Sequence, residues 1–148
     1  MKPARMESSE EPKLVARLAN GPAAVEQSRL AVLSYLEPLG IFARTLNRVE
    51  VVLEELVSNL VRHGKDVNLV TVAAGYRGGV VDLVVEDDGD AFDPFALPEP
   101  APPTTLADAP LGGLGIPLVR RLAASARYDR IGSGSDARNR ISVRITDG

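Results

Sequence analysis

The sequence predicts an α+β fold: a two-layer α/β sandwich with helices on one face of a mostly antiparallel mixed sheet. Residues 44–62 have the periodicity of a long amphipathic helix. Residues 67–76 and 80–86 are rich in Val and Leu and flank a Gly-Gly pair, which is typical of a β-hairpin. Two further strands are predicted at 127–131 and 139–146. The length of 148 residues fits one domain.

The elements before the long helix follow from simple local signals. Residues 1–12 have no apolar core, so we expect a disordered leader rather than a signal peptide, with the folded domain covering 13–148. Residues 13–18 alternate enough to predict a first strand near a sheet edge. Residues 23–37 carry apolar side chains at helical spacings, and the Pro38 and Gly40 region ends that helix.

The long helix carries a continuous apolar stripe. Its members recur at i, i+3, i+4, i+7 and i+11, which predicts one buried face: Val49, Val52, Leu53, Leu56 and Leu60. Gly64 is well placed to end this helix.

The composition changes sharply after Phe92. Six of the eleven prolines lie between Pro94 and Pro110, and this stretch has no Lys or Arg. A long proline-rich loop within a domain predicts a lid or a disordered insert at residues 94–111. A helix is then predicted at 114–126. It must begin at or just before Ile116, since Pro117 is tolerated only in a first turn. Its predicted buried residues are Leu118, Val119, Leu122 and Ala126.

The composition also argues against several classes of function. The chain has no cysteine and a single histidine, so neither a disulfide framework nor a thiolate or histidine metal site is expected. The formal net charge of −3 argues against direct nucleic-acid binding. No apolar run approaches the ~18 residues of a membrane span, so we expect no membrane contact and a cytoplasmic location.

A carboxylate and an amide share one face of the long helix. Glu55 and Asn59 are four residues apart, whereas Glu54 is rotated by about 100°. An amide oxygen is a suitable Mg²⁺ ligand, and a carboxylate one turn away can take a proton beside a γ-phosphate. Taken alone, such a pair is more typical of a solvated helix face than of a metal site.

Two further segments have the chemistry of a nucleotide site. Asp87 follows an apolar strand and can accept a hydrogen bond from an exocyclic amine such as adenine N6, while Gly89 lets the backbone approach a flat ring closely. Gly112, Gly113 and Gly115 lead into a helix start, where N–H groups can cradle an anion. Each segment alone would also fit an ordinary turn or a loop without a ligand.

In this order and setting, the segments resemble the GHKL ATPase superfamily, and within it the anti-sigma-factor serine/threonine kinases. The similarity covers about residues 13–145. It includes residues 55–64, 85–94, 112–121 and the closing 139–141.

The resemblance implies a Bergerat, or histidine kinase-like ATPase, fold that binds ATP and Mg²⁺, with residues 94–111 as the ATP lid. It makes Glu55 the catalytic base, Asn59 the Mg²⁺ ligand and Asp87 the adenine-binding residue. The implied nucleotide-binding residues are Asn59, Arg62, His63, Asp87, Gly89, Gly112, Gly113, Leu114 and Gly115.

Two features depart from the family pattern. Ala91 stands where the D-x-G-x-G motif has its second glycine. The lid region has no cationic residue, so positive charge at the γ-phosphate must come from Arg62, His63, Arg120, Mg²⁺ or a partner.

The leading functional hypothesis is a regulatory kinase that phosphorylates Ser or Thr of a STAS-type anti-anti-sigma partner, sequesters a sigma factor, or does both. The alternative is a non-catalytic ATP-binding module that acts by sequestration. The ATP-binding half of a histidine kinase ranks lower, because no helix pair carries a phospho-acceptor histidine. A homodimer or heterocomplex through the first strand is also expected, with the sheet face away from the helices as a docking surface.

Overall fold

The computed structural model describes residues 14–96 and 115–148. In chain order the elements are β1 (Leu14–Ala19), α2 (Ala23–Leu36), η1 (Glu37–Leu39), α3 (Ala43–His63), β2 (Leu69–Arg77), β3 (Val80–Asp87), η2 (Pro94–Ala96), α4 (Gly115–Leu122), β4 (Ser125–Ile131), η4 (Gly134–Asp136) and β5 (Arg138–Thr146). The predicted leader lies outside the described residues, and so does the predicted lid except for η2.

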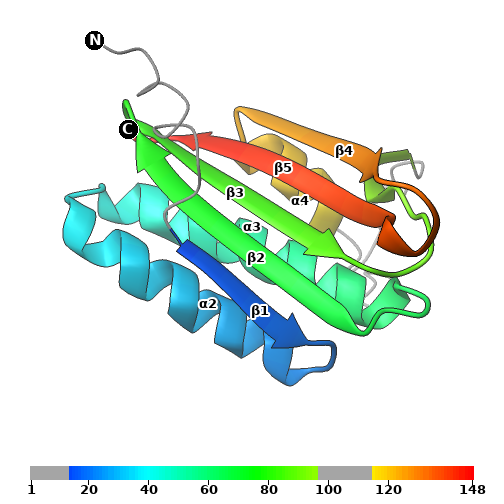
Figure 1. Cartoon of the computed structure of the whole chain (residues 1–148). Coiled ribbons are helices and arrows are strands. Elements are labelled where there is room, and N and C mark those ends of the chain that lie inside the picture. The colour runs from blue at the N-terminus through cyan, green and yellow to red at the C-terminus, as the bar shows by residue number, and fades with distance from the viewer. Residues whose placement is uncertain (1–13, 97–114) are drawn as a thin grey trace, which may run out of the picture.

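Five strands form one sheet in the order β1-β2-β3-β5-β4, and every neighbouring pair is antiparallel. Figure 1 shows α2, α3 and α4 together on one face of this sheet. The predicted α+β sandwich with helices on one face is therefore confirmed. In the described part of the chain, no helix is long and apolar enough to cross a membrane.

The predicted hairpin is confirmed as β2 and β3. Gly78 and Gly79 have φ angles of 60° and 77°, and Arg77 pairs with Val80 across them. Two central residues with positive φ make a two-residue turn of the type that matches the twist of antiparallel strands. Glycine is the residue that adopts this conformation without steric cost.

The core lies between α3 and the sheet. All five residues of the predicted α3 stripe are buried, from Val49 to Leu60, and they form one cluster with inward-facing residues of β3. In β3, buried and half-buried residues alternate from Val80 to Asp87. Asp87 continues the buried set after Val85, so it lies on the helix side of the sheet.

The predicted helix at 114–126 is too long. The helix α4 ends at Leu122, and Ala126, expected on its buried face, lies in β4 and pairs with Val143. The backbone N–H of Ala124 already donates to the carbonyl of Arg144, 2.8 Å away. Sheet hydrogen bonds thus override the helix propensity of this alanine-rich segment. Of the predicted buried face, Val119 is fully buried.

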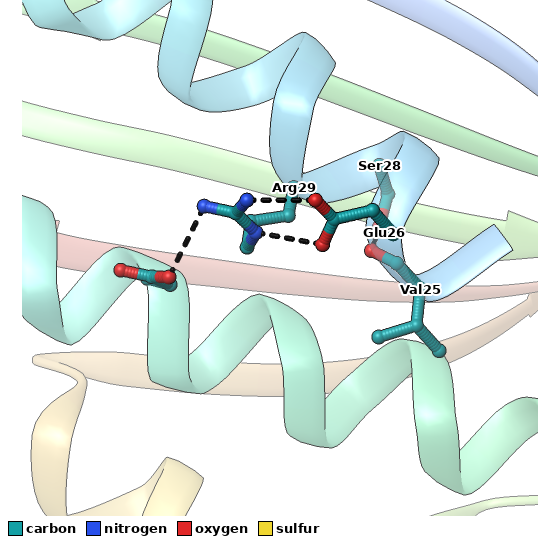
Figure 2. Close-up of polar contacts among 5 residues, drawn as sticks. Val25, Glu26, Ser28 and Arg29 are labelled. Carbon is teal, nitrogen blue, oxygen red and sulfur yellow. Dashed lines mark hydrogen bonds and ion pairs between the residues drawn. The ribbon is translucent and has the colours of Figure 1, made fainter. Parts of the chain in front are cut away.

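An ion-pair cluster joins α2 to α3. The guanidinium of Arg29 donates to both oxygens of Glu26, one turn away, and to Glu50 of α3 at 3.3 Å (Figure 2). In the same helix, the Ser28 hydroxyl donates to the Val25 carbonyl. Exposed ion pairs stabilise weakly, so this cluster adds a polar link between α2 and α3 and little stability.

Candidate functional site

Glu55 and Asn59 lie together on α3, as the spacing predicts, and both are half-buried. Burial raises the pKa of Glu55, the neighbouring Glu54 raises it further, and Arg62 opposes the shift. Glu54 itself is exposed. A carboxylate whose pKa is raised binds a proton more strongly, which suits a general base.

The start of α4 packs directly on Glu55. A Cβ atom placed on Gly115 would overlap the Oε1 atom of Glu55 and would lie 3.2 Å from its Cδ. Gly115 is buried, whereas Glu55 is half-buried and ends in a flexible carboxylate, so a residue larger than glycine at this position would displace that carboxylate. The structure thus brings the helix start predicted to bind phosphates against the predicted base. Gly112, Gly113 and Leu114 lie outside the described residues.

Two other glycines allow the end of α3 to approach the loop after β3. A Cβ on Gly64 or on Gly89 would clash with the same Val67 methyl group, and a Cβ on Gly89 would also clash with the Lys65 carbonyl. That carbonyl accepts a hydrogen bond from the Asp90 N–H at 2.9 Å. The close approach seen at Gly89 is therefore to protein backbone, and it joins the two segments that carry Asn59 and Asp87.

Asp87 is a buried carboxylate, 7% exposed, at the end of β3. Its Oδ1 accepts hydrogen bonds from the Gly89 N–H at 2.8 Å and from Asn139 Nδ2 at 3.0 Å. Burial raises the pKa of Asp87, while these two hydrogen bonds lower it in part. Within residues 14–96 and 115–148, Oδ2 has no hydrogen-bond partner. A buried acceptor in this state calls for a donor, such as the exocyclic amine of a purine.

The candidate cations differ in their availability. Arg62 and His63 are exposed at the end of α3, and the charge of Arg62 acts on Glu55. Arg120 instead donates to the Phe95 carbonyl at 2.8 Å and stacks 4.8 Å from the centroid of that ring. Arg62 and His63 therefore remain candidates to meet a phosphate, whereas Arg120 holds η2 against α4.

The donor set fits a magnesium ion with few protein ligands. In the described part of the chain, no cluster of three or more His, Asp or Glu side chains could enclose a metal. Mg²⁺ usually keeps several waters and takes one or two protein oxygens together with substrate phosphates. The amide oxygen of Asn59, beside Glu55 and near the start of α4, suits that mode of binding.

The sequence interpretation did not assign a role to Asn139, which is 4% exposed and hydrogen-bonds Asp87. The sequence nevertheless contains a pattern that points to Asn139. The inward-facing positions of β5 are otherwise apolar, from Ile141 to Ile145, and Asn139 continues the same alternation. A polar side chain buried at such a position must have hydrogen-bond partners, so it marks a polar network.

Comparison with known families gives a match over most of the chain. The family described as "Histidine kinase-like ATPase domain" matches residues 18–145. A search of curated proteins gave no match.

The matches among solved structures include the following three. The RsbU and RsbW domains of Rv1364c from Mycobacterium tuberculosis match with a TM-score of 0.59 and 17% identity, over 92% of this chain and 33% of that chain. The Acinetobacter baumannii histidine kinase AdeS matches with a TM-score of 0.44 and 14% identity, over 98% and 73%. The Erythrobacter litoralis blue-light activated histidine kinase EL346 matches with 0.45 and 16%, over 87% and 45%. This chain thus spans about a third of the length of the Mycobacterium chain in that structure.

Proposed function

Because the chain belongs to the histidine kinase-like ATPase domain family, we propose that it binds Mg-ATP and works as a regulatory kinase. It transfers the γ-phosphate to Ser or Thr of a STAS-type anti-anti-sigma partner, and it can hold a sigma factor. The match to a structure that includes an RsbW domain supports the fold on which this proposal rests. The choice of partner rests on the sequence motifs that resemble anti-sigma-factor kinases.

The observation that carries the nucleotide proposal is the buried Asp87 carboxylate. One of its oxygens is held by Asn139 and Gly89, and the other has no hydrogen-bond partner in the described part of the chain. An ionised carboxylate only accepts hydrogen bonds. It therefore suits the amine at adenine C6 and repels the carbonyl oxygen that guanine has there. Adenine is the base that this site favours.

Glu55 is the group that would move a proton. As the partner's hydroxyl oxygen forms its bond to the γ-phosphorus, Glu55 takes the hydroxyl proton, the bond from that phosphorus to the bridging oxygen breaks, and ADP leaves. Asn59 would supply an oxygen ligand to Mg²⁺, which when bound neutralises charge on the phosphate oxygens. Backbone N–H groups at the start of α4 would orient the anion.

The alternative function is ATP binding without transfer, with regulation by sequestration. One observation favours it: Arg120, one of the candidate cations for the γ-phosphate, is engaged by Phe95. If neither Arg62 nor His63 reaches the phosphate, transfer would need a cation from the partner.

Two surfaces are available for assembly. The strand β1 lies at one edge of the sheet, where a second chain could add a strand. No described helix covers the opposite face of the sheet, which carries the ion pairs Arg140–Glu86 and Arg144–Asp82. Light scattering on the full chain, alone and with STAS and sigma partners, tests both surfaces. A monomer that binds neither partner would contradict the regulatory proposal and leave nucleotide binding intact.

Calorimetry tests the nucleotide site. We expect ATP to bind more tightly with Mg²⁺ than without it, and Asn59→Ala to remove that difference. Asp87→Asn should reduce the preference for ATP over GTP, because an amide can donate as well as accept. Equal affinity of the wild type for ATP with and without Mg²⁺ would refute the role of Asn59.

Mass spectrometry separates the two functions. The wild type is incubated with Mg-ATP and a STAS protein, and the partner's mass is measured. A gain of one phosphate supports the kinase. No gain, with ATP binding intact, supports sequestration.

A further inference from the structure

The polar network around Asp87 assigns a role to Asn139. We propose that Asn139 is a positioning residue that fixes which Asp87 oxygen meets the purine, and that it thereby sets the preference for adenine over guanine. This inference rests on the nucleotide site proposed above, and it adds to that site a residue from β5, the strand that pairs with β3.

The amide hydrogens of Asn139 are both in use. Nδ2 donates to Oδ1 of Asp87 at 3.0 Å and to the carbonyl of Asp90 at 2.8 Å. An amide nitrogen has two hydrogens. Asn139 therefore has no donor left for a ligand, and it acts on a purine only through Asp87 and the loop that follows β3.

Three donors fix the orientation of this amide. Oδ1 of Asn139 accepts from the Tyr128 hydroxyl at 2.6 Å, from Nη1 of Arg130 at 3.0 Å and from the Phe92 N–H at 3.2 Å. If the amide were flipped, its N–H groups would face these three donors and its oxygen would face the Asp87 carboxylate. The surroundings thus encode which end of Asn139 meets Asp87.

This orientation decides what Asp87 can present. With Oδ1 occupied by Asn139 and Gly89, Oδ2 remains for the base, and the hydrogen bond from Asn139 favours the ionised carboxylate against burial. Without that bond, Asp87 would more readily take up a proton and become a donor. A protonated carboxyl suits the O6 acceptor of guanine, so discrimination against guanine would fall.

The other charges and titratable groups around Asp87 are few. Asp88 follows it in the chain and raises its pKa, whereas Arg130 of β4 lowers it. Arg130 also donates to the Gly89 carbonyl at 2.9 Å. The Tyr128 hydroxyl donates to Asn139, and the backbone carbonyl of Asp90 accepts from Asn139. In the loop after α3, the carbonyl of Lys65 accepts from the Asp90 N–H.

Two substitutions test the proposal. Asn139→Leu removes both donated hydrogen bonds at similar volume, and Asn139→Asp replaces the donors by carboxylate oxygens. Dissociation constants of Mg-ATP and Mg-GTP are measured by calorimetry between pH 5.5 and 8. We expect Asn139→Leu to lose ATP affinity by roughly ten- to hundredfold, the usual effect of one hydrogen bond to a charged group, and to lose less affinity for GTP.

Asn139→Asp has a distinctive pH signature. At pH 8 the two carboxylates repel each other, so ATP affinity should fall at least as far as in Asn139→Leu. As the pH is lowered, a proton shared between the two carboxyls replaces the missing N–H, so affinity should recover. The matched control is Ser142→Ala, which changes a side chain on the opposite face of β5 and should leave the ATP-to-GTP ratio unchanged.

Titration of Asp87 without nucleotide separates this inference from the proposed function. By carbon-detected NMR, the pKa of Asp87 should be higher in Asn139→Leu than in the wild type. If the wild type binds no adenine nucleotide, the proposed function fails, but the titration still tests whether Asn139 controls the pKa of Asp87. Folded variants that keep the wild-type Asp87 titration and ATP-to-GTP ratio at every pH would overturn the inference. Failure of Asn139→Asp to fold even at pH 5.5 would also overturn it.

Discussion

Two carboxylates along α3, Asp147 at its amino-terminal end and Glu55 in its carboxyl-terminal half, have pKa values shifted in opposite directions. At the amino-terminal end, Asp147 accepts hydrogen bonds from the Phe42 N–H at 3.1 Å and from the Tyr76 hydroxyl at 3.0 Å. Burial alone would raise its pKa, but its hydrogen bonds, which include one from Thr45, outweigh this effect and lower it. In the other half of the helix, burial raises the pKa of Glu55, whose carboxylate has no hydrogen-bond partner in the described part of the chain.

The difference separates a stabilising region of α3 from the region that carries the proposed catalytic base. The Phe42 end has no side-chain cap of its own, and Asp147 supplies an acceptor to the N–H of Phe42, the N-cap residue, and a negative charge at the start of α3. Glu55 and Asp87 are instead held with acceptor capacity unused, which costs stability in the empty protein. Carboxylates that anchor the fold have their hydrogen bonds satisfied within the protein, whereas those at the proposed ligand site do not.

The largest effect should come from replacing Glu55, the proposed catalytic base. Glu55→Ala should keep the fold and bind nucleotide, but lose phosphoryl transfer by roughly the 10²–10⁴-fold that a general base contributes. Glu54→Ala is the matched control, because that side chain is exposed and rotated away. Single-turnover transfer to the STAS partner measures both. Equal losses in the two variants would remove the distinction between Glu55 and its neighbour.

The packing of Gly115 on Glu55 gives the next largest effect. Gly115→Ala puts a Cβ into the Glu55 carboxylate, which is the end of a flexible side chain and must shift, so we expect a loss of about 0.5–1.5 kcal/mol in unfolding free energy, typical of a displaced rotamer. In the Glu55→Ala background the colliding atoms are gone, and the same substitution should cost much less. Chemical denaturation of the four proteins measures this coupling. Additive losses would mean that the two residues do not share a contact.

The sequence could predict α3 and its functional face because both depend on local periodicity. The buried stripe and the placement of Glu55 beside Asn59 follow from 3.6 residues per turn, and the hairpin follows from the glycine pair at 78 and 79. The boundary between α4 and β4 could not be predicted, because it depends on a hydrogen bond from Ala124 to Arg144 across the sheet. The contact between Gly115 and Glu55 joins segments 60 residues apart in the chain, and no local pattern encodes it.

The anchored end should show a smaller effect. Asp147→Ala removes the acceptor for Phe42 and Tyr76, so the melting temperature should fall by a few degrees at pH 7. The pKa of Asp147 is lowered, so its contribution is present above the ordinary aspartate pKa and is lost as the pH falls through the lowered value. The exposed Asp136 of η4 serves as control, and Asp136→Ala should change little. An unchanged melting temperature in Asp147→Ala would contradict the capping role.

The smallest expected effect concerns two adjacent residues, Asp87 and Asp88, whose pKa values are shifted in opposite directions. Asp87 has a raised pKa, chiefly from burial. Burial also acts on Asp88, but backbone hydrogen bonds from Leu69 and Asn68 outweigh it and lower its pKa. Asp87 belongs to the proposed nucleotide site, and Asp88 anchors the start of β2. Replacing each by Asn should therefore change the pH dependence of stability in opposite directions.

The signs follow from proton linkage. The native state binds a proton at Asp87 more tightly than the unfolded chain does, so Asp87 costs stability as the pH rises from the ordinary aspartate pKa through the raised one. As the pH rises across that window, the stability of Asp87→Asn should increase relative to that of the wild type. The ionised Asp88 stabilises the fold above the ordinary aspartate pKa, and this stabilisation is lost as the pH falls through the lowered pKa of Asp88. As the pH rises through this window, the stability of Asp88→Asn should therefore decrease relative to that of the wild type. Urea denaturation between pH 3 and 7 measures both differences. Slopes of the same sign would mean that Asp87 is an anchoring residue like Asp88, and that its unused oxygen is not held for a ligand.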